Sequence, residues 1–256
     1  MNTTARRIAG TSLAAAGAMC LAVGPALAAD TTVSGNLLPV ASNNVSKVSG
    51  TASVKVSGEM LTVTMVASGL LAGSAHAAHI HFGANARHAC PTIADDTNGD
   101  GHINTTEGAA AYGGVVVSLT TSGDTSPKSA LAVDRFSTAP GGEISYERGS
   151  IKVSPELAKA ISGGESAIVV HGVDYNKNGK YDGATKSDVD PALPTEATDP
   201  ALCGILKVAP AGGMNTGGGG GTGGSNQGLI VIGGALLLAG AGVGAFALKR
   251  RANAAA

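Results

Sequence analysis

The chain has 256 residues, of which 18 are acidic and 17 basic, so its net charge is −1 at neutral pH. Five of the basic residues lie in its two ends, which leaves residues 30–210 with 12 basic and 18 acidic residues, a net charge of −6. This negative charge excludes nucleic acid as a partner and favours cations. Only 3% of the residues are aromatic and none is tryptophan, so the core must be built from aliphatic side chains.

The first 29 residues have the composition of a secretory signal peptide. Arg6 and Arg7 precede an apolar run, and Ala26-Leu27-Ala28 has the small residues of a cleavage site. The sequence therefore predicts that residues 1–29 direct export and are removed from the mature protein.

Residues 30–210 are long enough for one domain with its own core, and their pattern predicts an all-β fold. The stretch "ASVKVSGEMLTVTMVASGL" (residues 52–70) alternates apolar and polar residues on both sides of Gly58-Glu59, which is typical of a β-hairpin with one buried face. Many short strands joined by Gly-rich turns predict an antiparallel Greek-key sandwich or barrel. The other strands are expected at residues 31–38, 77–82, 115–121, 144–153, 167–171 and 204–208.

One short helix is expected in this domain, at "SPELAKAIS" (residues 154–162). Ser154 is a favourable capping residue, and Pro155 suits the first helical position because its missing N–H would have no partner there.

Three histidines are candidate ligands of a transition metal. His79 and His81 are two residues apart on a predicted strand, so both side chains point to the same face. His171 ends another predicted strand. Imidazole groups bind copper and other late transition metals. Paired histidines without a ligand role are the alternative interpretation.

The stretch "DDTNGDGHINTTEG" (residues 95–108) matches the calcium-binding loop of EF-hands. Acidic and amide side chains recur at the spacing of that twelve-residue template, with Gly at the sharp turn and a bidentate Glu at the last position. The expected Ca²⁺ ligands are Asp96, Asn98, Asp100, the carbonyl of His102, Asn104 and Glu107. Neither flank has the pattern of an amphipathic helix, so we expect an isolated loop in which the ion clamps the chain. A solvated turn rich in Asp and Asn is the alternative.

A second calcium loop is predicted at "DYNKNGKYDG" (residues 174–183), where the match is weaker. Its ligands would be Asp174, Asn176, Asn178, the carbonyl of Lys180 and Asp182. Thr185 stands where the template has the bidentate Glu, and neighbouring lysines oppose a cation. A plain Asn-Gly turn is the alternative interpretation.

The cysteines predict one disulfide. Cys20 lies in the signal peptide, so Cys90 and Cys203 are the two thiols of the exported domain and have a single pairing. Because the bond closes a loop of more than a hundred residues, it would stabilise the fold by roughly 4 to 5 kcal/mol in the chain-entropy model.

The C-terminal end predicts a membrane tether. Residues 211–227 form a Gly-rich linker, and residues 228–248 carry no charge over a length of roughly 31 Å, enough to cross a bilayer. The basic residues that open the tail at 249–256 should keep that tail in the cytoplasm. A buried core helix is the alternative for residues 228–248, and covalent attachment by a sortase at "NTG" (residues 215–217) is the alternative mode of anchoring.

Four motifs resemble the Cu,Zn superoxide dismutases. They are "HIHFG" (residues 79–83), Cys90, "AIVVHG" (residues 167–172) and "ALCGIL" (residues 201–206). The hairpin that leads into "GLLAGSAHAAHIHFG" (residues 69–83) is more similar to the chordin-type (CHRD) domain, a family thought to share the dismutase-like sandwich. The resemblance implies that the two cysteines are bonded and that His79, His81 and His171 correspond to copper ligands.

The chain departs from the dismutase pattern where catalysis depends on it. The calcium-like loop occupies the place of the metal-bridging histidine, and no cluster of zinc-binding histidines follows. Pro200 replaces the arginine that guides superoxide, and His76 is interpreted as a loop residue rather than a replacement ligand. We therefore expect an exported, membrane-tethered CHRD-type module without catalytic activity, whose protein partner the sequence does not identify. A copper-dependent superoxide dismutase and a surface or periplasmic copper storage or delivery protein are the alternatives.

Overall fold

The computed structural model of the chain describes residues 30–43 and 45–209. The predicted signal peptide, linker, transmembrane segment and tail lie outside these residues. In the described part no helix is long and apolar enough to cross a membrane. The described strands are β1 Thr31–Pro39, β2 Ser49–Ser57, β3 Met60–Ser68, β4 Ala78–Phe82, β5 Gly114–Ser118, β6 Ile144–Lys152, β7 Ala167–His171, β8 Pro200–Ile205 and β9 Lys207–Val208.

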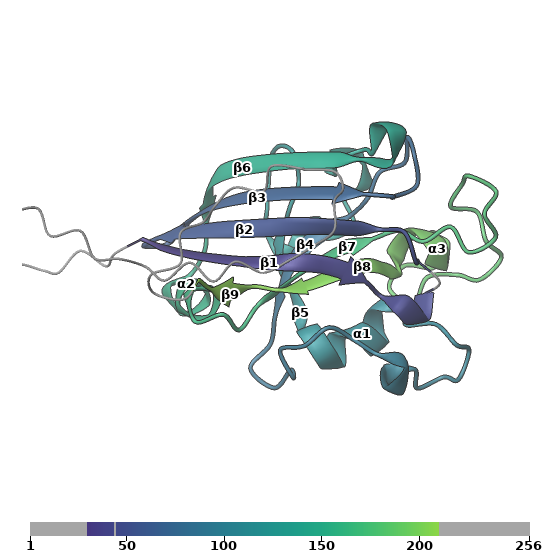
Figure 1. The fold of residues 1–256 in the computed structure, drawn as a ribbon, viewed down its shortest axis with the longest axis horizontal. Helices are drawn as coiled ribbons and strands as arrows, with labels where there is room; N and C mark the ends of the chain where they lie inside the picture. Colours follow the sequence, from purple (N-terminus) through teal and green to yellow (C-terminus); the bar gives the residue numbers. More distant parts are fainter. Residues whose placement is uncertain (1–29, 44, 210–256) are drawn as a thin grey trace, which may run out of the picture. The chain divides into compact units, whose positions relative to one another are not determined.

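The strands form one antiparallel sheet that is curled into a half-barrel (Figure 1). Their order is β5-β4-β7-β8-β1-β2-β3-β6, and β9 pairs with β1. The two ends of this path approach each other, because Tyr146 and Arg148 of β6 donate hydrogen bonds to the carbonyl of Thr120, just beyond β5. The predicted all-β class with an antiparallel sheet is therefore confirmed.

The β2–β3 hairpin shows why the sequence forms these strands. Leu61, Val63 and Met65 are buried and alternate with exposed residues, as the period of two requires. The turn lies at Gly58-Glu59 as predicted, and Gly58 has φ +58°, a conformation that a residue without Cβ adopts at little cost.

The two faces of strand β7 pack into different clusters. Ile168 and Val170 belong to the main aliphatic core, which collects side chains from most strands. Ala167 and Val169 point the other way, into a smaller cluster that includes Tyr112 and Cys203. All five residues of β7 are buried, because the chain between the strands covers this second face. That covered face holds the histidines.

The prediction of one short helix is wrong, since the described part of the domain has three α-helices. α2 (Pro155–Ser162) is the predicted one, and Ser154 caps it by accepting a hydrogen bond from Leu157 N. The other two are α1 (Thr105–Tyr112) and α3 (Thr195–Thr198). Their sequences lack a clear apolar stripe: capping initiates α1, and α3 is a single turn held by the surrounding loops.

Candidate metal centre

The sheet brings the three predicted histidines together. His79 and His81 lie on β4, and His79 is opposite Val169 of β7, so His171 two residues later points to the same face. One ring nitrogen from each histidine lies within 4.8 Å of the others. Among the described residues this is the one group of three or more His, Cys, Asp or Glu side chains that converges in this way. The cluster could hold a metal ion.

Backbone carbonyl groups fix the orientation of each imidazole ring. His79 Nε2 lies 3.0 Å from the carbonyl of Ala130, His81 Nδ1 lies 3.0 Å from that of Gly113, and His171 Nδ1 contacts that of Thr198. Because a carbonyl oxygen only accepts, each of these nitrogens carries the proton. The other nitrogen of each ring therefore keeps its lone pair.

The three remaining nitrogens, Nδ1 of His79 and Nε2 of His81 and His171, are buried and have no hydrogen-bond partner within the described part of the chain. Leaving a buried polar atom without a partner costs about 1–3 kcal/mol. Three such atoms directed at one point, with their tautomers set by carbonyl groups behind them, have the arrangement of metal ligands and their supporting shell.

Burial keeps the cluster uncharged. Burial, followed by the nearby His171, lowers the pKa of His81 to about 3, and burial lowers that of His171 to about 4. The pKa of His79 is lowered well below its ordinary value, first by burial and then by the nearby His171 and His81. Neutral imidazole is the form that binds a metal, so the site is ready for an ion at neutral pH.

His76 is buried next to this cluster but does not belong to it. Its Nδ1 lies 2.8 Å from the carbonyl of His171, and its Nε2 lies 3.2 Å from that of Leu71. The hydroxyl of Tyr181 packs against the same ring. His76 thus supports the backbone at the end of β7, which agrees with its interpretation as a loop residue.

A cavity of about 170 Å³ lies against His79 and His171. Its walls come from β5 and from the segments that cover the sheet face, and they are mostly apolar. They include Ala77, Val115, Leu131, Val133, Val189 and Leu193. Leu131, Val133 and Val189 are partly exposed, so the cavity opens to the surface between them. No charged side chain is among its described lining residues.

The charges near the cluster are negative. The carboxylate of Asp188 raises the pKa of His171 against the larger effect of burial. Burial, followed by the charges of Asp188 and Asp199, raises the pKa of Tyr112, whose ring stacks edge-on against His81. Pro200, at the place of the expected arginine, lies in β8 opposite His171. An anion approaching the cluster would meet repulsion rather than attraction.

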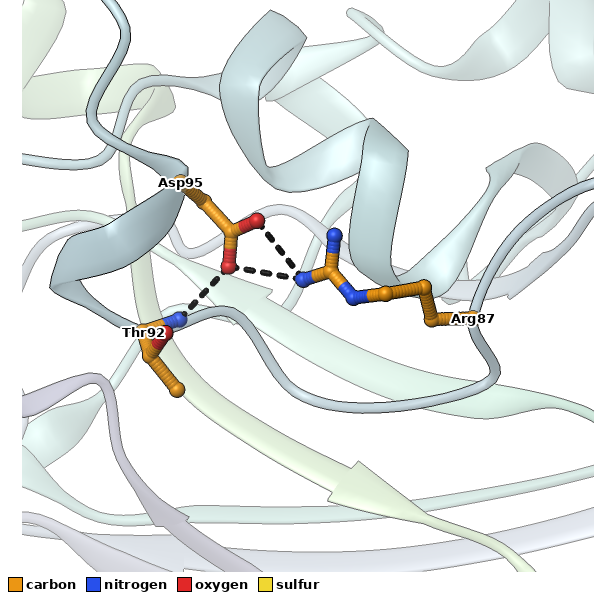
Figure 2. A network of polar contacts seen from close by, with 3 residues as sticks. All are labelled: Arg87, Thr92 and Asp95. Carbon is orange, nitrogen blue, oxygen red and sulfur yellow. Dashed lines mark hydrogen bonds and ion pairs between the residues drawn. The ribbon is translucent and has the colours of Figure 1, made fainter.

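The predicted disulfide is present and fastens the covering segment to the sheet. Cys90 and Cys203 are bonded with their Cα atoms 5.7 Å apart. Nearby, both carboxylate oxygens of Asp95 accept from Arg87 Nη2, at 2.6 and 2.8 Å, and one also accepts from Thr92 N (Figure 2). These bonds fix the path of the chain between His81 and the first acidic loop.

The first acidic loop folds around its own carboxylates. Glu107 is buried, and its Oε1 accepts from the backbone N–H groups of Thr97 and Asn98 while Oε2 accepts from Asn104 N. Asp96 accepts from two glycine N–H groups of the turn. The expectation of an isolated loop is wrong on one side, because α1 begins at Thr105, where the exiting helix of an EF-hand would begin.

A local cap explains this helix. The Asn104 side chain accepts from Glu107 N, and Glu107 in return accepts from Asn104 N, which completes a capping box. The helix also needs Gly108, since a Cβ there would lie 2.2 Å from the Tyr112 hydroxyl. This reciprocal cap, rather than an apolar stripe, was the sequence signal for the helix.

The second acidic loop has the same hydrogen-bond pattern, with a glutamate that the sequence did not reveal. Glu196 of α3 is buried, and its Oε1 accepts from Tyr175 N and Asn176 N. Its Oε2 accepts from Asp182 N and Gly183 N. Tyr175, Asn176 and Asp182 occupy the same template positions as the first-loop residues whose N–H groups Glu107 accepts from. Gly183 N is one further donor. Thr185 is exposed and takes no part in this pattern.

No protein-family model matches the chain, and no curated protein sequence matches it. The function must therefore be inferred from the site itself, which consists of three neutral, converging imidazoles, an apolar cavity beside them and two acidic loops.

Proposed function

We propose that this chain is an exported, membrane-tethered copper-binding module of CHRD type, with a dismutase-like Greek-key fold and without rapid superoxide turnover. The observation that carries the proposal is the convergence of three unpartnered histidine nitrogens whose opposite ring nitrogens bond to backbone carbonyl groups. Among divalent ions, Cu²⁺ binds nitrogen ligands most tightly. A bound copper ion would supply redox chemistry, and His79, His81 and His171 would hold it.

Three observations favour binding over dismutation. The lining of the cavity is apolar, the nearby carboxylates repel anions, and Pro200 stands where the family resemblance places a guiding arginine. Superoxide is an anion, so its approach would be slow in such a field. A copper-dependent superoxide dismutase is the alternative, and a copper storage or delivery protein would use the same ligands without turnover.

Copper binding can be tested on the purified full-length protein. We expect one Cu²⁺ per chain, with nitrogen hyperfine structure in the electron paramagnetic resonance spectrum. His81→Gln and His171→Gln should each weaken binding by more than about 100-fold, since even a supporting residue contributes 10- to 100-fold. His88→Gln is the matched control, because His88 bonds to the carbonyl of Gly83 outside the cluster. Unchanged binding in both cluster variants would exclude this site.

Activity separates the alternatives. The copper-loaded protein is expected to dismutate superoxide slowly or not at all. A rate near the diffusion limit would support the dismutase function instead of a binding module.

We further propose that both acidic loops bind Ca²⁺ and clamp the covering segments. For the first loop the support is its match to the template and the buried Glu107 at the bidentate position. For the second loop it is Glu196, which takes the part that Glu107 plays in the first. The ions would stabilise the module and take no part in chemistry at the histidines.

A further inference from the structure

The cavity beside the histidines has the size and lining of a small-molecule site. The candidate ligands His79 and His171 line the cavity. Most of the other lining residues have aliphatic side chains and come from residues 130–133 and 189–197. Leu131 and Val189 are each 41% exposed at its mouth. A soluble domain rarely exposes several apolar side chains around one opening without a use for them.

The volume sets the size of the occupant. A cavity of about 170 Å³ is close to the roughly 150 Å³ of an engineered apolar cavity that stays dry and binds benzene. One six-membered ring with one or two substituents fills such a space. A lipid chain or a peptide side chain with its backbone is too large to be enclosed.

The lining sets the chemistry of the occupant. An anion would lose its hydration without meeting a cationic side chain, and Asp188, whose charge acts on the lining residue His171, adds repulsion. A neutral, mostly apolar molecule loses little on entry.

We propose that the cavity binds an uncharged, monocyclic organic molecule, enclosed by its apolar lining. The site thus selects neutral ring compounds over small anions.

The proposal is tested on the metal-free protein. Toluene is titrated into the metal-free full-length protein while methyl resonances of Leu131, Val133, Val189 and Leu193 are followed by nuclear magnetic resonance. We expect saturable shifts confined to these methyl groups, with a dissociation constant of about 1 mM. Shifts that are absent, or spread over the surface without saturation, would overturn the inference.

Substitutions in the cavity lining test whether toluene binds there. Ala197→Leu adds volume to the lining and should weaken toluene binding by about tenfold or more. The matched control is Ala192→Leu, the same change at an exposed position outside the cavity, which should bind as the wild type does. If Ala197→Leu does not fold, Val189→Glu places a charge at the open mouth and should weaken binding in the same way. Binding unchanged in the cavity variants would overturn the assignment.

The selectivity is tested with an anion of similar shape. We expect benzoate, at the concentration at which toluene saturates the cavity, to leave the same methyl resonances unchanged, because no cationic side chain lines the cavity. Equal, saturable shifts with benzoate would overturn the selectivity. If copper does not bind while toluene does, the proposed function fails and the cavity stands. If copper binds and toluene does not, the reverse holds.

Discussion

The histidine cluster and the two acidic loops present their candidate ligand atoms in opposite ways. Nδ1 of His79 and Nε2 of His81 and His171 are buried without partners, and one ring nitrogen of each histidine lies within 4.8 Å of the others. The carboxylates of Asp96 and Asp174 lie near the surface and accept hydrogen bonds from glycine and asparagine N–H groups of their own loops. A rigid sheet can hold unsatisfied atoms in place, whereas a loop satisfies its acids locally. The first site is formed before an ion arrives, and the loops must exchange N–H contacts for an ion.

The largest expected effect that distinguishes the two regions is acid sensitivity. In the unfolded chain a histidine has a pKa near 6.5, whereas burial holds that of His81 at about 3 and that of His171 at about 4. Below pH 6.5 these histidines are therefore protonated in the unfolded state but stay neutral in the folded state. The free energy of unfolding falls by about 1.4 kcal/mol per pH unit for each histidine.

Asp199 opposes this trend. Burial raises its pKa to about 7, so the folded state takes up a proton between pH 7 and 4 that the unfolded carboxyl does not, which stabilises the fold on acidification. Three buried histidines stand against one aspartate, so we expect the free energy of unfolding, measured by urea titration, to fall by about 2.7 kcal/mol per unit between pH 6 and 4. His81→Gln should flatten this slope and Asp199→Asn should steepen it. A free energy independent of pH in this window would contradict the buried, neutral cluster.

The disulfide gives the second largest effect and separates the two loops. Cys90 lies in the segment that carries the first loop, and Cys203 lies in the sheet. Replacing both by serine should lower stability by roughly 4 kcal/mol. Hydrogen exchange should rise at residues 84–104 and stay unchanged at residues 174–183. Equal loss of protection in both loops would show that the bond acts on the whole fold rather than on one segment.

Calcium binding is expected to change stability by an intermediate amount and so tests the two loops directly. At a Ca²⁺ concentration 100 times the dissociation constant, each occupied loop adds about 2.7 kcal/mol, visible as a higher melting temperature. Glu107→Gln and Glu196→Gln should each remove part of this rise, measured by calorimetry against the same variant in EDTA. Glu147→Gln, on the exposed face of β6, should keep all of it. A melting temperature that does not respond to Ca²⁺ in the wild type would make both loops plain turns.

The smallest effect is expected at Arg87. Its guanidinium is half exposed, so its pair with Asp95 should contribute no more than about 1 kcal/mol. Arg87→Met keeps the aliphatic stem and should lower the unfolding free energy by that amount, without changing Cu²⁺ affinity. A large loss of copper binding would mean that this ion pair positions His81 through the covering segment.

Local patterns in the sequence were enough to predict much of the fold. Alternation fixed the β2–β3 hairpin and its Gly58-Glu59 turn, because one buried face repeats every second residue. The same rule placed His79 and His81 on one face, and counting cysteines predicted the Cys90–Cys203 bond. The hairpin and the shared face of the two histidines depend on residues close together in the chain. The disulfide had a single possible pairing.

Long-range contacts decided the rest. Glu196 reaches the second loop from a helix outside its sequence template, and no spacing rule connects them. The helix α1 depends on a reciprocal cap rather than on an apolar stripe. The cavity is lined by segments that are distant in the sequence, one before β6 and one after β7. The sequence by itself determined which histidines can bind a metal. Tertiary structure alone determined which nitrogens are protonated and where an apolar ring can be enclosed, because carbonyl groups and side chains distant in the sequence set both.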